Sequence, residues 1–200
     1  MIVIVGGQHR KIGKTALIEA ILRGLPAAGW TAVKITTHHA PAGSEKPVRV
    51  LEETAPSPES DTGRYLAAGA ARAYLVQCSE NAVVDACEAL RRSGILEGAV
   101  VIESGTAAEH LPADVFLLLV DADPRADAKP GFPLAIERAG AFVVTVPPGP
   151  GPACRLRLPP GPPRFFVRPW AFHSRPLIEF LRAKLRPGAF SRRQGEPPGQ

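Results

Sequence analysis

The fold of this chain is decided by residues 2–16, which read IVIVGGQHRKIGKTA. Residues 2–5 are a continuous apolar run, as a strand buried on both faces of a parallel sheet requires. The run stops at two glycines. From Lys14 onward, apolar residues recur every three or four positions, which is the period of a helix. The segment therefore predicts a buried strand, a glycine-rich loop and a helix in direct succession.

The loop from Gly7 to Thr15 has the features of a phosphate-binding loop. Glycine lets the backbone approach an anion, and the first N–H groups of the following helix point toward it. Lys14 would reach the β- and γ-phosphates, and the Thr15 hydroxyl would bind Mg²⁺. The alternative is a glycine turn that only begins a helix. We predict a site for GTP or ATP with Mg²⁺, formed by Gly7, Gln8, His9, Arg10, Lys11, Ile12, Gly13, Lys14, Thr15 and Ala16.

The spacing within this loop departs from the common pattern. Five residues separate Gly7 from Gly13, where four are usual, and Gln8 stands where the pattern places its first glycine. The spacing resembles the loop of dethiobiotin synthetase and its relatives among P-loop proteins. Those synthetases carry an acidic residue in the loop, whereas this loop carries His9, Arg10 and Lys11. Gln8 also replaces the extra lysine of the partitioning ATPases.

Strands and helices alternate along the rest of the chain, which predicts a parallel, doubly wound sheet. The fold class is α/β, with three layers and helices on both faces of a mostly parallel sheet. The expected strands are 31–35, 73–77, 99–102, 115–120 and 141–146, and the expected helices are 61–70, 81–92, 133–138 and 176–185.

We expect one domain over residues 1–186. Residues 39–61 have no clean period and predict a long mobile loop, a type that is often functional. Residues 147–163 are rich in proline and glycine and predict a connector, with an edge strand at 154–158 as an option. Residues 187–200 predict a disordered tail.

Two further segments resemble the MobB family of adaptors in molybdopterin guanine dinucleotide biosynthesis. The first is residues 33–39 (VKITTHH), and the second is residues 61–70 (DTGRYLAAGA). With the loop, the resemblance covers residues 1 to about 105. It implies a P-loop NTPase fold, GTP binding with slow hydrolysis, and homodimer formation. It also implies a nucleotidyltransferase partner and molybdopterin as a second ligand.

The two histidines of the first segment, His38 and His39, follow a parallel strand beside the phosphate loop, where ligands bind in such sheets. They would donate to an anion or ligate a metal, and the alternative is that they are ordinary loop residues. Arg64 in the second segment is a candidate anion clamp, or else a charge on a helix surface.

A carboxylate follows another expected strand, at Glu103. In P-loop proteins an acid in this place holds Mg²⁺ or orients the nucleophile, so we predict that Glu103 acts with Lys14 in catalysis and with Thr15 at the metal. The alternative is a helix-capping or surface residue. The Asn-Lys-x-Asp signature of guanine recognition is absent, which leaves the choice between GTP and ATP open.

Two functions are compatible with these motifs. The first is a MobB-like adaptor that is at most a weak NTPase. The second is an ATP-dependent ligase or kinase of the dethiobiotin synthetase type, acting on a small molecule. The missing acid in the loop counts against the second function.

Composition excludes several other classes. The longest apolar run near a strand, 115–120, is far shorter than the ~20 residues of a membrane span. No signal segment precedes Ile2, so we expect a cytoplasmic protein. Three cysteines without a CxxC pair indicate thiols in a reducing compartment. The net charge is +5, but several basic residues crowd the C-terminal tail, which disfavours a nucleic-acid site.

Overall fold

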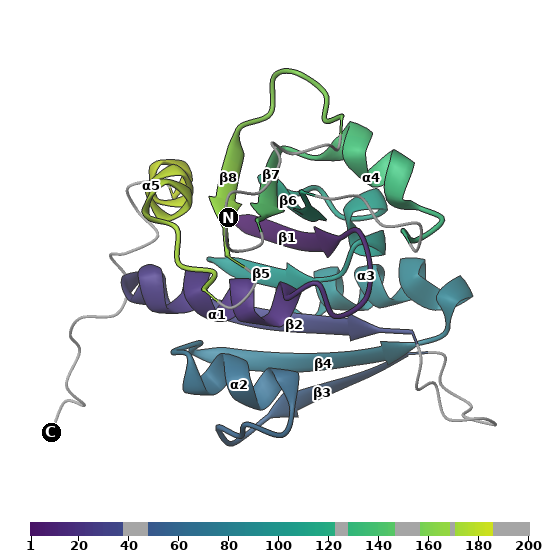
Figure 1. Cartoon of the computed structure of the whole chain (residues 1–200). Helices are drawn as coiled ribbons and strands as arrows, with labels where there is room; N and C mark the ends of the chain where they lie inside the picture. Colours follow the sequence, from purple (N-terminus) through teal and green to yellow (C-terminus); the bar gives the residue numbers. More distant parts are fainter. Residues whose placement is uncertain (38–47, 123–127, 147–156, 169–170, 186–200) are drawn as a thin grey trace, which may run out of the picture.

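The computed structural model describes residues 1–37, 48–122, 128–146, 157–168 and 171–185. These residues form an eight-stranded sheet with five α-helices (Figure 1). The strand order is β3-β4-β2-β5-β1-β6-β7-β8. The strands are β1 (Ile2–Gly7), β2 (Thr31–Thr36), β3 (Val48–Glu53), β4 (Arg72–Cys78), β5 (Val100–Glu103), β6 (Val115–Asp121), β7 (Ala141–Thr145) and β8 (Arg164–Val167). The helices are α1 (Lys14–Gly24), α2 (Asp61–Ala67), α3 (Val83–Arg92), α4 (Phe132–Arg138) and α5 (Arg175–Lys184).

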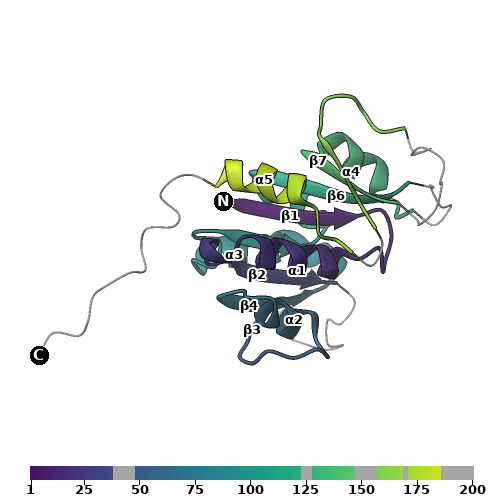
Figure 2. The ribbon, with the colours of Figure 1, turned by 60° about the vertical axis from the view of Figure 1, so that its left-hand side comes forward.

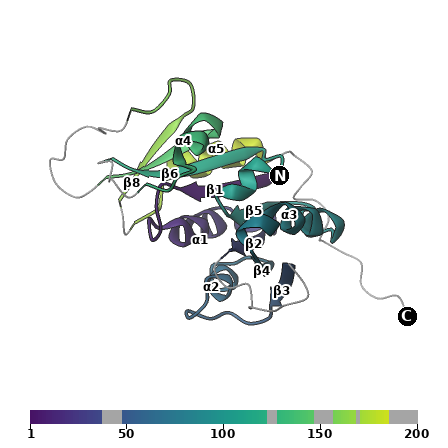
Figure 3. The ribbon, with the colours of Figure 1, turned by 90° about the vertical axis from the view of Figure 1, so that its right-hand side faces the viewer.

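Helices cover both faces of the sheet, in three layers. Side chains alternate along each strand, so Val3 and Val5 of β1 join the core beneath α1, α2 and α5, whereas Ile4 joins the core beneath α3 and α4. Figure 2 shows α1 in front of the central strands, and Figure 3 shows α1 and α3 on opposite sides of β2 and β5. The predicted α/β fold with a mostly parallel sheet is confirmed.

The sheet places the carboxyl ends of its central strands together. β1 pairs in parallel with β5 on one side and β6 on the other, and β2 pairs with β5. The register sets Val5 beside Glu103, and Lys34 beside Glu103 on the other side. Three strand ends therefore meet where the loop after β1 begins, and this is where open parallel sheets bind ligands.

The segment 39–61 differs from its prediction as one long loop. Residues 48–53 form β3, which runs antiparallel to β4 at the edge of the sheet. Its four middle residues are exposed, so the alternation of buried and exposed positions that marks a strand is missing there. Residues 38–47, which include His38 and His39, lie outside the described residues.

The last strand also differs from the prediction. Residues 157 and 158 are not in a strand, and residues 154–156 lie outside the described part. Instead β8 follows the proline-rich stretch and extends the sheet in parallel with β7. It has only four residues, which is too short for a clear periodic signal. The predicted tail 187–200 is also outside the described residues.

Candidate functional site

The loop between β1 and α1 has backbone geometry that only glycine adopts easily. Gly13 precedes α1 with φ of 103°, in the left-handed region. A Cβ atom on Gly13 would lie 2.2 Å from the ring of Phe172, so the aromatic side chain packs directly on this glycine. Among the described residues, no side chain caps the start of α1 and no acid lies in its first turn. Its first N–H groups are therefore available to an anion.

Gln8 ties this loop to the end of β6. Its backbone N–H donates to the Leu119 carbonyl at 2.9 Å, and its side-chain oxygen accepts from the Asp121 N–H at 3.0 Å. Its own carbonyl accepts from the Lys129 N–H at 3.0 Å. Gln8 is 1% exposed. Gln8, which was predicted to belong to the nucleotide site, therefore holds two segments of the protein together.

His9 makes a second connection to β6. Its Nε2 atom lies 2.7 Å from Oδ2 of Asp121, and its Nδ1 atom lies 2.6 Å from the Arg10 carbonyl oxygen. The Thr145 hydroxyl donates to the other oxygen of Asp121 at 2.5 Å. These contacts hold the imidazole ring between the Asp121 carboxylate and the backbone of Arg10. His9 therefore positions the loop.

Three oxygen donors meet at the start of α1. The Thr15 Oγ1 atom lies 2.9 Å from Oε2 of Glu103 and 3.1 Å from Oδ1 of Asp61. Asp61 opens α2, because the Ser60 hydroxyl caps this helix by accepting from the Gly63 N–H at 2.9 Å. A hydroxyl and two carboxylates at these distances are the oxygen ligands that Mg²⁺ prefers.

Lys34 lies among the same carboxylates. Its ammonium donates to Asp61 and lies 3.3 Å from Oε1 of Glu103. Burial opposes the charged form, but Glu103 and Asp61 outweigh it, so the pKa of Lys34 is raised. Desolvation likewise acts to raise the pKa of Asp61, but the hydrogen bond from Lys34 outweighs it and the net pKa is lowered. Both groups are therefore held in their charged forms at neutral pH.

Tyr65 forms a hydrogen bond to Glu103 from the buried side of the site. Its hydroxyl donates to the same Glu103 oxygen that Thr15 contacts, and its side chain is fully buried in the core beneath α1, α2 and α5. Burial first, and then the charge of Glu103, raise the pKa of Tyr65 well above its usual value. The phenol therefore stays protonated and fixes the orientation of the carboxylate.

These groups line a cavity of about 500 Å³. Six basic side chains line it against two carboxylates, namely Arg10, Lys11, Lys14, Lys34, Arg64 and Lys129 against Asp61 and Glu103. Burial lowers the pKa of Lys14, although Glu103 at 4.0 Å opposes that effect. An excess of positive charge in a partly closed cavity favours a polyanionic ligand.

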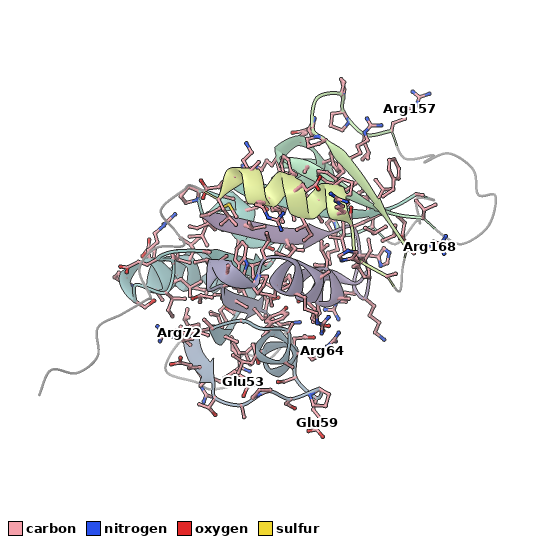
Figure 4. All side chains as sticks on the ribbon, turned by 90° about the vertical axis from the view of Figure 1, so that its left-hand side faces the viewer. Glu53, Glu59, Arg64, Arg72, Arg157 and Arg168 are labelled. Carbon is pink, nitrogen blue, oxygen red and sulfur yellow. The ribbon has the colours of Figure 1, made fainter. Side chains whose placement is uncertain are left out.

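The predicted site residues differ in how they relate to this cavity. Its lining includes Arg10, Lys11, Gly13, Lys14, Thr15, Ala16, Arg64 and Glu103. Gly7 lines the adjoining cavity, whereas Gln8, His9 and Ile12 are not among the described residues that line this one. Arg64 pairs with Glu19 of α1 at 2.6 Å, so it also connects α2 to α1. Figure 4 shows the position of Arg64 beside α2.

Sequence analysis did not assign Lys34, Asp61 or Lys129 to the site. Lys34 and Asp61 belong to the two segments that resemble MobB, but no motif in those segments assigned a role to either side chain. Within the described residues, no group of three or more His, Cys, Asp or Glu side chains could hold a metal. A metal here would therefore need Thr15 and the nucleotide phosphates to complete its ligands.

Two solved structures have a similar fold. The crystal structure of HypB from Helicobacter pylori in complex with nickel is 16% identical in sequence, with a TM-score of 0.58 over 97% of this chain and 91% of that one. The structure of LpxK from Aquifex aeolicus in complex with ATP is 18% identical, with a TM-score of 0.50 over 82% of this chain and 53% of that one. No family model and no curated protein matches the sequence.

Identities this low show the fold alone. The chain shares with these neighbours an α/β fold with a mostly parallel sheet and helices on both faces. Among the described residues, no helix has the length and apolar character needed to cross a membrane.

Proposed function

We propose that this chain binds Mg²⁺ and a nucleoside triphosphate, with GTP preferred, and acts as a MobB-like adaptor in molybdenum cofactor biosynthesis. One observation carries the nucleotide-binding part. The carboxylates of Asp61 and Glu103 both lie within 3.1 Å of the Thr15 hydroxyl at the start of α1, inside a cavity where basic side chains outnumber acidic ones. This arrangement is complementary to a magnesium triphosphate.

The adaptor part draws on the MobB resemblance. Asp61 and Arg64 belong to one of the two segments that carry it, and both line the phosphate cavity. The partners would be a nucleotidyltransferase and molybdopterin. The protein would act as a homodimer in the cytoplasm. The HypB structure is a complex with nickel and the LpxK structure is a complex with ATP, so chains of this fold can bind a metal ion or a nucleotide.

Slow hydrolysis is part of this proposal. No glutamine is among the described residues that line the phosphate cavity, so the side chain that orients the attacking water in fast GTPases has no counterpart there. Glu103 is already engaged by Thr15 and Tyr65. We expect turnover far below the ~10 s⁻¹ of a median enzyme. Fast phosphate release that depends on a small molecule, with no protein partner present, would contradict the adaptor role.

The binding site itself is tested at Lys14. Replacing Lys14 with alanine removes the charge nearest the predicted phosphates, and binding of GTP or ATP with Mg²⁺ should weaken by about tenfold or more. Calorimetric titration of both proteins measures this. Lys184→Met, which removes an exposed lysine at the far end of α5, should bind as wild type does. Equal affinities of Lys14→Ala and wild type would refute the phosphate site.

A second candidate function is supported by a separate feature. A cavity of about 450 Å³ adjoins the phosphate cavity, and it has room for a small acceptor molecule. An ATP-dependent ligase or kinase would need such a space, whereas an adaptor that acts only through its nucleotide state would not.

A further inference from the structure

The adjoining cavity lies between α4 and the 3₁₀ turn η3 (Thr106–Glu109), on the face of the sheet covered by α3 and α4. Its floor is made by Phe116 and Leu118 of β6, and Phe132 of α4 forms a wall. All three side chains are less than 9% exposed, so they give the cavity a fixed apolar surface. Apolar walls with a few polar groups are characteristic of small-molecule sites.

The position of Phe116 depends on a glycine. A Cβ atom on Gly6 would lie 2.8 Å from the Phe116 ring, so the ring rests against the backbone of β1. This contact keeps the aromatic ring close to the backbone of the sheet. The cavity on the other side of the ring is therefore open to a ligand.

This cavity joins the phosphate cavity. Five residues line both, and they are Arg10, Thr37, Gly105, Thr106 and Lys129. Gly105 and Thr106 follow Glu103, the last residue of β5, after Ser104, so the junction lies next to the proposed metal-binding end of the phosphate site. In a P-loop, the lysine and the metal mark the terminal phosphate. A molecule in the second cavity would therefore face the γ-phosphate.

Lys129 supplies positive charge at the junction. The residue is exposed, and among the described residues no carboxylate pairs with its ammonium. Its backbone N–H is fixed to the Gln8 carbonyl, which anchors the residue beside the phosphate loop. Desolvation and the charge of Arg10 lower the pKa of Lys129, and Glu103 opposes this only in part. A second anion beside the phosphates would stabilise the charged form of the Lys129 ammonium.

The cavity is lined by other charged side chains, and their distribution differs between its two ends. Arg138 also lines it, from the end of α4, and Glu80 and Glu109 line it from η2 (Glu80–Ala82) and η3. The junction with the phosphate site is lined by Arg10 and Lys129 and by no carboxylate of the described residues that the two cavities share. An anionic group on a ligand is therefore favoured at that end, and its apolar part over Phe116.

We propose that this cavity binds a small organic anion, with a flat ring on the apolar floor of Phe116, Leu118 and Phe132 and with its carboxylate or phosphate at Lys129, facing the terminal phosphate of the nucleotide. This proposal rests on the proposed nucleotide site and adds to it the class of its second ligand. It applies whether the molecule receives a phosphoryl group or is only held there.

The test uses three ring probes of similar size: benzoate, phenyl phosphate and the neutral benzamide. Each is titrated by saturation-transfer NMR against the full chain, saturated with Mg²⁺ and a non-hydrolysable GTP analogue so that the phosphate loop is occupied. We expect at least one anion to bind about tenfold or more tightly than benzamide, because its contact with the ammonium is charge-assisted. The stronger of the two anions identifies a carboxylate or a phosphate as the natural group.

Variants then test whether the probe binds in this cavity. Ala135→Leu fills the cavity from α4 and should weaken anion binding by about tenfold or more, whereas its match Ala183→Leu, on the exposed side of α5, should not. If Ala135→Leu fails to fold, Ala108→Leu fills the same cavity from η3. Lys129→Met should reduce the preference for anions over benzamide.

The outcomes separate the two proposals. Equal binding of all three probes, or anion binding that Ala135→Leu and Ala108→Leu leave unchanged, would overturn the second site while nucleotide titrations still report on the first. Absence of nucleotide binding in wild-type protein would instead refute the proposed function. Neither filling variant touches the phosphate cavity, so both should keep wild-type nucleotide affinity.

Discussion

Replacing Lys34 with methionine tests the charge balance of the phosphate site. Methionine keeps most of the aliphatic length of the side chain but removes the ammonium. In the wild-type protein that ammonium donates to Asp61 and lies 3.3 Å from Glu103. The variant would leave two carboxylates close together around the Thr15 hydroxyl, with Arg64 at 3.8 Å from Asp61 and Lys14 at 4.0 Å from Glu103 as the remaining described cations. We expect Lys34→Met to destabilise the nucleotide-free protein.

The size of the effect follows from distance and burial. At 3.3 Å and an effective dielectric constant of 20, two unit charges attract with about 5 kcal/mol before desolvation is counted. The side chains of Lys34 and Glu103 are 22% and 7% exposed, so this pair is neither a surface pair nor a fully buried one. Fully buried pairs cost about 3–5 kcal/mol when broken, and exposed pairs up to about 1 kcal/mol. We therefore expect a loss of about 2 kcal/mol.

Urea unfolding of wild type, Lys34→Met and the control Lys184→Met measures this loss. The raised pKa of Lys34 means that its contribution is present below its ordinary value of 10.5 and is lost as pH rises above it. The lowered pKa of Asp61 means that its contribution is present above 3.8 and is lost as pH falls below it. The deficit should therefore be constant between about pH 5 and 9 and smaller below pH 4. A deficit below about 0.5 kcal/mol at pH 7 would refute this reasoning.

Two further predictions concern the metal and a buried thiol. Asp61→Asn should raise the Mg²⁺ concentration needed for half-maximal nucleotide binding by about tenfold or more, measured by calorimetry, whereas Asp85→Asn in the first turn of α3 should not. Burial raises the pKa of Cys87 to about 11, so its alkylation by iodoacetamide at pH 8 should be about 100-fold slower in the native protein than in urea; comparable rates, read by peptide mass spectrometry, would show that the thiol is accessible.

The fold could be predicted from the sequence where strands are buried on both faces. β1, β5 and β6 are continuous apolar runs at the centre of the sheet, and each was expected within two residues of its observed bounds. β3 and β8 were missed because both lie at edges of the sheet. An edge strand packs on fewer neighbours, so its sequence is less constrained and its pattern weaker.

The candidate site could be predicted only in part. Spacing in the sequence identifies a strand, a loop and a helix, and with them Lys14 and Thr15. Asp61 reaches the same point from a separate helix, and only the parallel pairing of β2 with β5 brings Lys34 beside Glu103. Such contacts between distant segments depend on the strand order, which a single sequence does not specify.

The loop residues Gln8 and His9 show a related limit. Their types suit phosphate binding, since both can donate hydrogen bonds. Both side chains instead bond to Asp121 of β6, 112 or more positions away. These two contacts fix the start of the loop to β6, whereas Gly13 and Lys14 lie at the start of α1.

Lys34 and a metal ion would meet the same two carboxylates through different oxygen atoms. The Thr15 hydroxyl lies at Oδ1 of Asp61 and Oε2 of Glu103, whereas the Lys34 ammonium contacts Oδ2 of Asp61 and Oε1 of Glu103. Mg²⁺ bound beside Thr15 would therefore place a second positive charge close to the ammonium, and the two cations would repel each other. The phosphates that enter with the metal carry the negative charge that offsets this repulsion. We therefore expect metal binding and nucleotide binding to be coupled through the charge of Lys34.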